Sequence, residues 1–491
     1  MRMWIAVLAP VAALCLHAAE GAGVFERGTD VGPSGPRGSV EYDAAAGTYR
    51  ITGGGANMWE TSDGFYFVWR KVAGDAAITA DFEWQTAGGH LHKKAGPMLR
   101  AGLGPDDAYA DIVAHADGLV SLQYRKAKGQ PTLEVRTPLK APVTLRLERH
   151  GDVISAEVAP RGGEFHPVGS FSMALPETVY AGLAVCSHDA SATQTALFRN
   201  VVFRTGGVAG PEARAVESTL ETVDIDTGLR RVVLRQAAHF EAPNWSPDGK
   251  WLLYNGGGAL YRIAVSGGAP ERIGTGDIRL NNDHGISPDG RLVAISGSAG
   301  RGGSQIFVVP ITGGVPRLVV SARPSYWHGW SPDGKTLVYC AERNGNYDVY
   351  SIPAEGGEER RLTTAEGLDD GPEYSPDGKW IYFNSERSGL MQIWRMRPDG
   401  TEQELVSRGA PSADWFAHPS PDGRWIVYLA YDKAVKGHPP NQNVVLKIMP
   451  AAGGEPRVLA TLFGGQGTIN VPSWSPDSRQ VAFVSYRPVA K

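Results

Sequence analysis

The chain has 491 residues, enough for two or three domains that each bury a core of their own. Its 62 glycines and 34 prolines, beside 42% hydrophobic residues, are typical of a turn-rich all-β protein and argue against a helical or disordered one. The formal net charge is −4 and no run of lysines or arginines occurs, so the composition argues against nucleic acid as a partner.

The first 22 residues have the pattern of a signal peptide. Arg2 precedes an apolar run over residues 3–16, and small residues follow it. The run is shorter than a transmembrane helix needs, so we expect an exported mature chain, periplasmic or secreted, without a transmembrane segment. Cys15 raises lipidation as an alternative, but the preceding Leu14 is larger than the residue that lipoprotein cleavage prefers.

Residues 24–204 form a first predicted domain of short strands. Ile78, Ala80 and Phe82 alternate with polar neighbours, as in a strand with one buried and one solvated face. Similar runs follow without a sequence repeat, which predicts a two-sheet β-sandwich. Segments 63–70, 94–100 and 179–188 resemble the concanavalin-A-like or laminin-G-like jelly roll of secreted bacterial proteins. The resemblance implies a fold that binds glycans in some proteins, although fold does not dictate function.

Few residues of this domain have the pattern of a metal or redox site. His90 and His92 have a spacing found in metal sites, but we interpret them as exposed loop residues. Beyond the leader the only cysteines are Cys186 and Cys340, which fall in different predicted domains. We therefore expect two buried free thiols and no thiolate zinc site.

A linker of small residues, 205–213, leads to a second predicted domain over residues 214–488. This domain repeats a hexapeptide six times, and the repeat period is typical of a β-propeller. Every copy contains Ser-Pro-Asp, with an aromatic residue before it in most copies, glycine after it in all but the last, and lysine or arginine at the end. Proline and aspartate suit the central positions of a type I turn, and glycine supplies the left-handed residue after them. The serines of the six copies are Ser246, Ser287, Ser331, Ser375, Ser420 and Ser475.

Each repeat contains enough β-type segments for one four-stranded propeller blade. The last copy is followed by a single strand, 481–485. The two strands missing from that blade lie before the first copy, at 222–226 and 231–234. We therefore predict an all-β chain with six blades, the last assembled from both ends of the segment, which leaves no open sheet edge.

The hexapeptide repeats resemble those of the TolB-like propeller family over residues 214–488. The resemblance implies the fold. Relatives of this kind include envelope-binding proteins, propellers attached to serine peptidases, and oligogalacturonate lyases with a metal at the channel mouth. No Gly-x-Ser-x-Gly elbow in a strand-to-helix setting accompanies the repeats, which argues against the peptidase comparison.

The segments before the Ser-Pro-Asp-Gly turns begin the inner strand of each blade, so they should meet around one mouth of the channel. Polar side chains together with aromatic rings suit a polar ligand such as a sugar. We therefore predict recognition of a glycan or another envelope polymer at this mouth. The candidate ligand-binding residues are Asn282, Asp283, Trp327, Asp369, Glu373, Arg387, Trp415, His418 and His438.

Several of these residues also have a structural interpretation. Trp327 and Trp415 fit the core as well as a ligand platform. Aspartates such as Asp369 often cap loop amides. Arg343 and Arg387 occupy matching places in neighbouring blades, so they fit a repeated ion pair as well as a substrate clamp.

A metal-assisted enzyme is the first alternative function. His284, His328 and His418 are candidate ligands for a divalent metal that would acidify a substrate proton. Such a site would resemble the oligogalacturonate lyases and implies a polysaccharide lyase or other glycoside-active enzyme. Against it, His418 stands one position nearer its serine than the other two, and neighbouring strand positions point to opposite faces. The candidate catalytic residues are His284, His328, Asp370 and Arg343.

The second alternative is a protein-binding scaffold. The family resemblance implies it, because some TolB-like propellers hold an envelope protein at the propeller mouth. A scaffold predicts capture of a protein and no affinity for sugars.

Overall fold

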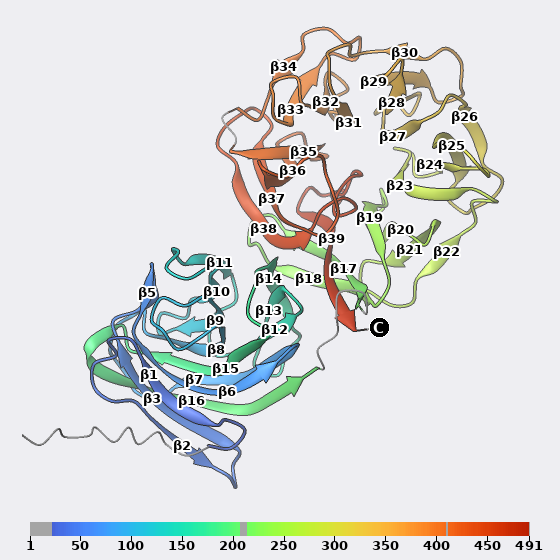
Figure 1. Ribbon diagram of the computed structural model, residues 1–491. Coiled ribbons are helices and arrows are strands. Elements are labelled where there is room, and N and C mark those ends of the chain that lie inside the picture. The colour runs from blue at the N-terminus through green and yellow to red at the C-terminus, as the bar shows by residue number, and fades with distance from the viewer. Residues whose placement is uncertain (1–21, 207–213, 409–410, 491) are drawn as a thin grey trace, which may run out of the picture.

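The computed structural model describes residues 22–206, 214–408 and 411–490. These residues form strands and turns without a helix, arranged as a β-sandwich followed by a β-propeller (Figure 1). The predicted leader up to residue 21 and residues 207–213 of the predicted linker lie outside the described ranges. Within those ranges no helix is long and apolar enough to cross a membrane.

Two seven-stranded antiparallel sheets pack face to face in the N-terminal part. In spatial order the first sheet consists of β1 (Arg27–Val31), β6 (Phe65–Ala73), β15 (Thr178–Cys186), β8 (Lys94–Arg100), β9 (Tyr109–His115), β10 (Val120–Arg125) and β11 (Leu133–Thr137). The second consists of β14 (His166–Ser172), β13 (Val153–Pro160), β12 (Val143–His150), β7 (Ala76–Trp84), β16 (Asp189–Thr205), β3 (Thr48–Gly55) and β2 (Ser39–Asp43). Side chains alternate between the two faces of a strand, so every second residue of β7 can point into the space between the sheets. Ile78, Ala80 and Phe82 are buried there. The concanavalin-A-like identity of this sandwich stays a prediction.

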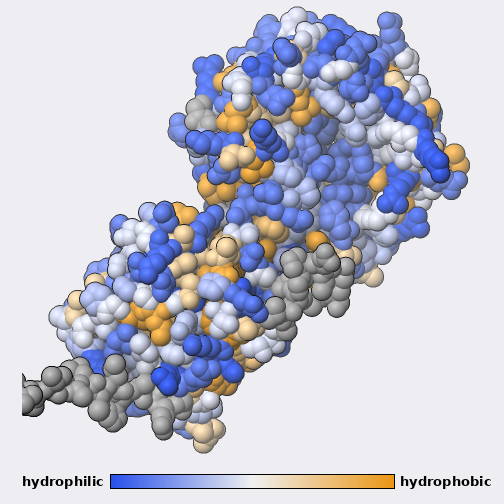
Figure 2. Space-filling model, viewed as in Figure 1, coloured by the Kyte–Doolittle hydropathy of each residue, from blue (hydrophilic) through white to orange (hydrophobic). Residues whose placement is uncertain are grey.

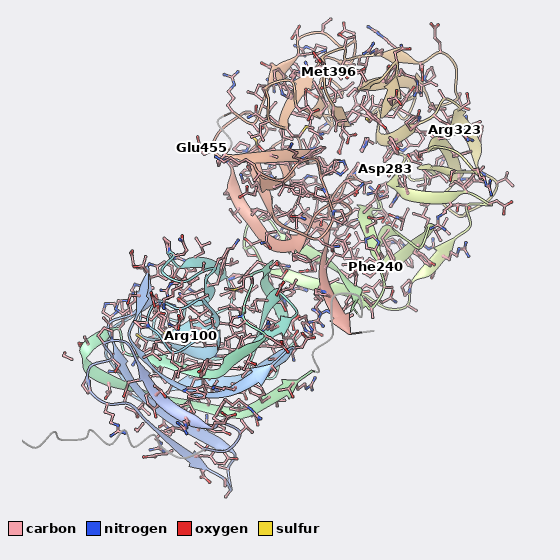
Figure 3. The ribbon with its side chains drawn as sticks, in the orientation of Figure 1. Arg100, Phe240, Asp283, Arg323, Met396 and Glu455 are labelled. Carbon is pink, nitrogen blue, oxygen red and sulfur yellow. The ribbon has the colours of Figure 1, made fainter. Side chains whose placement is uncertain are left out.

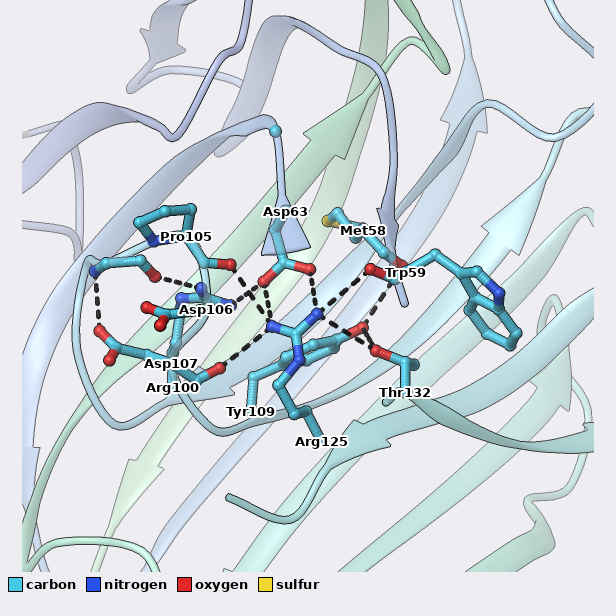
Figure 4. Close-up of polar contacts among 12 residues, drawn as sticks. Met58, Trp59, Asp63, Arg100, Pro105, Asp106, Asp107, Tyr109, Arg125 and Thr132 are labelled. Atoms are coloured by element: carbon cyan, nitrogen blue, oxygen red, sulfur yellow. Dashed lines mark hydrogen bonds and ion pairs between the residues drawn. The ribbon is translucent and has the colours of Figure 1, made fainter. Parts of the chain in front are cut away.

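The outer face of the first sheet is also buried, under a hairpin of β4 (Met58–Trp59) and β5 (Ser62–Asp63). There the Asp63 carboxylate lies between two guanidinium groups (Figure 4). Arg125 donates from Nη1 and Nη2 to the two Asp63 oxygens at 2.6 and 2.8 Å, and Arg100 Nη1 lies 2.8 Å from Oδ2. Arg100 Nη2 also donates to the carbonyl oxygen of Gly104, and Arg125 Nε donates to that of Gln130. This charged cluster therefore fastens three loops to the sheet.

Five blades of the propeller have four strands each (Figure 1). Blade 1 consists of β19 (Phe240–Trp245), β20 (Trp251–Gly256), β21 (Ala259–Ala264) and β22 (Glu271–Ile273), and blade 2 of β23 (Arg279–Ile286), β24 (Leu292–Ser298), β25 (Gln305–Pro310) and β26 (Arg317–Val320). Blade 3 consists of β27 (Ser325–Trp330), β28 (Thr336–Arg343), β29 (Asn346–Pro353) and β30 (Arg360–Arg361), and blade 4 of β31 (Asp369–Tyr374), β32 (Ile381–Ser385), β33 (Gln392–Met396) and β34 (Glu404–Leu405). Blade 5 consists of β35 (Ser412–Pro419), β36 (Trp425–Asp432), β37 (Gln442–Pro450) and β38 (Arg457–Gly464).

Blade 6 joins the two ends of the propeller. β39 (Gln480–Ala490) pairs with β17 (Arg214–Asp224), and β17 pairs with β18 (Arg230–Gln236). On the inner side, a bridge between Trp474 and Val481 attaches the preceding segment. The prediction of a six-bladed propeller with a shared last blade is confirmed.

The repeated hexapeptide forms the same turn in all six blades. In each copy the serine Oγ donates to the aspartate Oδ1 at 2.6 or 2.7 Å and accepts the backbone amide five residues further on at 2.9 or 3.0 Å. The glycine after the aspartate has a positive φ, for example 71° at Gly334, and Ser478 takes this place in the last copy. The serine thus ties the start of the second strand to the turn.

We expect Ser331→Ala to lower the free energy of unfolding by about 1 kcal/mol, because Asp333 and the amide of Thr336 each lose a hydrogen-bond partner. Urea denaturation would measure the change. Ser321→Ala, at an exposed serine of the neighbouring blade, serves as the matched control and should stay within about 0.5 kcal/mol of the parent. Equal losses in both variants would contradict the role of the serine in the turn.

The sandwich contacts the propeller through its edge strand β14 (Figure 1). Asn443 of blade 5 exchanges two hydrogen bonds with the backbone of Ser172, at 2.6 and 3.0 Å. Arg487 of blade 6 forms ion pairs with Glu148 of the sandwich and, at 2.6 Å, with Glu217. These contacts cover a sheet edge that would otherwise expose unpaired backbone groups.

Candidate functional site

The inner strands of blades 1 to 5 carry a β-bulge where they enter the channel. The pairing register shifts between Glu241 and Asn244, Leu280 and His284, Trp327 and Gly329, Asp370 and Glu373, and Trp415 and His418. A bulge adds unpaired residues to one strand and redirects their side chains away from simple alternation. Side chains of the bulged segments can therefore turn toward the channel.

The bulged segments surround a cavity of about 370 Å³ at this mouth of the channel, which we call the mouth cavity. Its volume lies in the range of ligand pockets. Figure 2 shows a hollow at the centre of the propeller among hydrophilic residues, and Figure 3 places Asp283 on the inner side of the ring. The lining residues are Asn281, Asn282, Asp283, Tyr326, His328, Cys340, Tyr347, Leu368, Asp370, Phe416, His438, Gln466 and Asn470.

On one side of the mouth cavity, the carboxylate of Asp370 lies beside two histidines. Its Oδ1 lies 3.1 Å from His328 Nε2, and its Oδ2 lies 3.9 Å from His438 Nε2. Burial alone would raise the pKa of Asp370, but the two imidazoles and the amide of Gly371 outweigh burial and hold that pKa well below its usual range. Burial alone would lower the pKa of His328, whereas Asp370 and Asp283 raise it. Asp370 is therefore ionised beside an imidazole that favours its protonated form.

Asp283 is a second buried carboxyl group in the mouth cavity. Asn281 Nδ2 and Asn470 Nδ2 each donate to it at 3.0 Å. Burial raises the pKa of Asp283 to about 7, helped by the charges of Asp370 and Glu241 and opposed by His328 and Asn470. The Oδ1 of Asn470 is buried and has no hydrogen-bond partner among the described residues. A ligand with hydrogen-bond donors would satisfy this acceptor.

A second histidine–carboxylate pair lies further along the channel. Glu373 Oε2 is 2.5 Å from His418 Nδ1, and His418 Nε2 is 2.5 Å from the carbonyl oxygen of Ile469. Both ring nitrogens of His418 therefore have partners. Glu373 also lines a cavity of about 390 Å³ among the prolines and aromatic residues of the hexapeptide turns. Neither Glu373 nor His418 lines the mouth cavity, and their ligand-binding roles stay predictions.

The mouth cavity brings together five of the predicted site residues. These are Asn282, Asp283, His328, Asp370 and His438. His438 comes from the insertion in blade 5, and its ring centroid lies 5.3 Å from that of Phe416. Their functional roles stay predictions.

Eight further lining residues were outside the set of predicted site residues, among them Tyr326, Phe416, Tyr347 and Gln466. Tyr326 and Phe416 stand directly beside predicted residues, so the segments before the turns already contained the signal for them. Phe416 has a φ of 55°, the left-handed position of its bulge. Tyr347 and Gln466 come from a third strand and from a glycine-rich loop, where no sequence signal marks them.

Trp327 and Trp415 do not form a ligand platform. Their exposed fractions are 0% and 1%, and both belong to hydrophobic core clusters. The Trp327 ring lies against Gly285 of the neighbouring blade, where a Cβ atom would be 1.9 Å from the ring. The predicted ligand-binding role of the two tryptophans is wrong because the ring positions fill the space between blades.

The predicted metal site of His284, His328 and His418 is wrong as well. His284 is fully buried, and burial lowers its pKa to about 3, so it is a neutral core residue without the predicted catalytic role. His418 has both nitrogens in use. Among the described residues, the propeller has no three ligand atoms of this kind within 4.8 Å of one another. The three histidines therefore do not form one metal site, and no lyase step is derived through them.

The predicted clamp residues Arg343, Asp369 and Arg387 anchor loops. Arg343 pairs with Glu359 at 2.9 Å and donates to Ser325 Oγ at 2.9 Å. Arg387 Nη2 lies 2.7 Å from Asp369 Oδ2. Each arginine thus forms a structural ion pair, although the partner is not the glutamate that precedes it in the sequence. None of the three residues lines the mouth cavity, and their catalytic and ligand-binding roles stay predictions.

Cys340 lines the mouth cavity but does not fit a nucleophile. Its Sγ donates to the carbonyl oxygen of Asp369 at 3.4 Å. Burial, with the charge of Asp370, raises the pKa of the thiol well above its ordinary value, so the reactive thiolate does not form. Cys340 and Cys186 are both free and buried, as predicted.

Comparison with known proteins identifies relatives of the propeller. Residues 324–489 match the PD40 family, described as the TolB beta propeller domain. An uncharacterized protein of Agrobacterium fabrum, Atu1656, is 51% identical over 277 residues, which are 56% of this chain and 94% of that protein. A solved structure from Agrobacterium tumefaciens that bears the name TolB is 51% identical with a TM-score of 0.55, and covers 56% of this chain and 100% of its own. The Tol-Pal system protein TolB of Bordetella pertussis is 27% identical over 145 residues, 28% of this chain and 33% of that protein.

Proposed function

This chain belongs to the TolB-like β-propeller family, and from this premise we propose that it is an exported envelope protein that binds a polypeptide segment of a partner at its propeller mouth. The predicted leader and the relatives named for the Tol-Pal system support a periplasmic location and a protein partner. The sandwich, fixed beside blades 5 and 6, would provide a second surface for that partner.

The observation that carries the proposal is the charge of the mouth cavity. Asp283 and Asp370 line it together with buried amides, and none of the described lining residues is a lysine or arginine. The buried Oδ1 of Asn470 adds an acceptor without a partner. A lysine or arginine side chain, or a free amino group, supplies hydrogen-bond donors for this acceptor and a further positive charge beside Asp283 and Asp370.

The same charges argue against an acidic polysaccharide. A uronate would bring a further negative charge to Asp283 and Asp370, with no guanidinium in the cavity lining to compensate for it. A neutral glycan could not stack on Trp327 or Trp415, because both rings lie in the core. The experiment must therefore distinguish peptide binding from the glycan binding that the sequence predicts.

We expect the full chain to bind members of an arrayed peptide library that contain lysine, arginine or a free amino terminus. Asp370→Asn should weaken the best peptide about 10- to 100-fold, because a charge-assisted hydrogen bond contributes about 1.5–3 kcal/mol. Isothermal titration calorimetry with that peptide measures the loss.

Asp226→Asn is the matched control, since Asp226 is an exposed aspartate in the β17–β18 turn. Its peptide affinity should equal that of the parent. Binding of a neutral oligosaccharide that Asp370→Asn abolishes, without any peptide binding, would replace the proposal with the glycan function. Release of new reducing ends or unsaturated sugars would replace it with an enzyme.

A further inference from the structure

We propose that the sandwich contains a binding site for a divalent transition metal, formed by His92, His115 and Asp117. One ligand atom from each of these residues lies within 4.8 Å of the others. His92 Nδ1 and Asp117 Oδ2 are 4.0 Å apart. In a tetrahedral zinc site with bonds of about 2.0–2.2 Å, neighbouring ligand atoms are about 3.4 Å apart. Small side-chain rotations therefore suffice to close the site around an ion.

His115 provides evidence that is independent of this proximity. The residue is 4% exposed, and its Nδ1 is buried without a hydrogen-bond partner in the described part of the chain. The other ring nitrogen lies 3.5 Å from Gln123 Nε2. A buried polar atom without a partner costs free energy, and a bound metal would remove that cost.

The backbone holds the three residues in place before any ion binds. The loop that carries His92 pairs with the turn after β9, through Ala116 N to Lys93 O at 3.2 Å and Asp117 N to Leu91 O at 3.1 Å. Asp117 Oδ1 accepts the amide of Leu119 at 2.9 Å, which turns Oδ2 toward His92. Preorganised ligands of this kind lose little conformational entropy when a metal binds.

Lys93, which follows His92 in the same loop, also holds that loop against the sandwich. Lys93 is 2% exposed, and its Nζ donates to the carbonyl oxygens of Thr86 and Gly88 at 2.9 and 2.6 Å and to Gln194 Oε1 at 2.7 Å. These bonds occupy the ammonium group and keep the loop on the sheet. His92 is thereby held beside the end of β9.

Two more histidines lie beside the site. The rings of His90 and His188 stack at 4.1 Å, and the His188 centroid is 5.9 Å from that of His92. Two imidazoles on one tetrahedral ion have centroids about 5 Å apart. His188 can therefore complete the coordination, or water can, since the His92 side chain is 53% exposed. The interpretation of His90 and His92 as plain exposed loop residues misses this arrangement.

The donor set selects the class of metal. Two imidazole nitrogens and one carboxylate suit Zn²⁺, and Ni²⁺ and Cu²⁺ are its chemical competitors. Ca²⁺ and Mg²⁺ prefer oxygen ligands and should not bind here. The site is separate from the propeller mouth, so it stands independently of the proposed peptide binding.

The test is a Zn²⁺ titration of the untagged full chain in competition with a chromophoric chelator, with Co²⁺ absorption as a second readout. The parent should bind one equivalent. His92→Ala and Asp117→Asn should each weaken binding at least tenfold. Both residues are at the surface, so melting temperatures of the metal-free variants should match the parent and show that the fold is intact.

Two control variants locate the effect. His239→Ala changes a half-exposed histidine of the propeller, and His328→Gln changes the mouth cavity. Both should bind Zn²⁺ as the parent does. The proposal is overturned if the parent binds no Zn²⁺ at micromolar concentration, if His92→Ala and Asp117→Asn bind it unchanged, or if only His328→Gln loses it.

Discussion

Asp63→Ala should destabilise the sandwich by about 3–5 kcal/mol, because it leaves two buried guanidinium groups without a counter-ion. The side chains of Asp63, Arg100 and Arg125 all have 0% exposure in this cluster (Figure 4). Hydrogen–deuterium exchange measured on peptides from β8 and β10 reports the sandwich separately from the propeller. Protection there should fall by about 10²-fold to several thousandfold, roughly 2 to 3.6 decades, since about 1.4 kcal/mol corresponds to a factor of ten.

Asp152→Ala is the matched control for this variant, because Asp152 is exposed in the β12–β13 turn of the same domain. Its peptides should keep the protection of the parent within a factor of about three. Asp63→Asn keeps the shape of the side chain but removes the charge, so it should fall between the two. Unchanged protection in Asp63→Ala would show that backbone carbonyls alone satisfy the two arginines.

Asp283→Asn should remove from the propeller a pH dependence of stability of about 4 kcal/mol. The carboxyl group ionises near its ordinary pKa of 3.8 in the unfolded chain, whereas burial raises the folded value to about 7. Between these values only the unfolded state loses its proton as the pH rises. The stability that this group contributes is therefore complete below pH 4 and is lost by pH 7 and above.

Urea denaturation of the parent and of Asp283→Asn at pH 4.5, 6 and 8 measures this effect. The variant should gain stability relative to the parent as the pH rises, with the largest gain at pH 8. His328, Asp370 and Glu241 are present in both proteins, so the difference reports Asp283 together with its coupling to these groups, chiefly to His328, whose pKa Asp283 helps to raise. Asp226→Asn should differ from its parent by the same small amount at every pH. A constant difference for Asp283→Asn would mean that water reaches this carboxyl group.

The architecture of the propeller was predictable because its signals are local. A Ser-Pro-Asp-Gly turn needs only consecutive residues, and the same serine and aspartate bonds recur in every copy, from Ser246 to Ser475. Counting strands was enough to assign β17 and β18 to the blade of β39. The tryptophans that precede the turns pack between blades because their place beside the turn fixes their direction. Trp330 Nε1, for example, donates to the carbonyl oxygen of Gly285 in the preceding blade.

The candidate site was predictable only in part. Asn282, Asp283 and His328 could be found because they stand just before the turns, at the start of an inner strand. His284 and Trp327 stand in the same segments but lie in the core. The register shift of blade 2 places two extra residues in β23, between Leu280 and His284, whereas that of blade 3 places one in β27, between Trp327 and Gly329. Because strand side chains alternate with a period of two, this difference of one residue lets His284 and His328 face different sides although both stand three residues before their serines.

The sequence by itself determined the number of blades, the closure of the ring and the end of each inner strand that forms the mouth, because turn chemistry and repeat period act within one blade. Only the tertiary structure decided which side chains line the cavity and which lie in the core. Bulges and burial depend on neighbouring blades, so the pairing of His328 with Asp370 has no signal along the chain. The same is true of His92, His115 and Asp117, which meet because a loop pairs with a turn from another part of the sandwich.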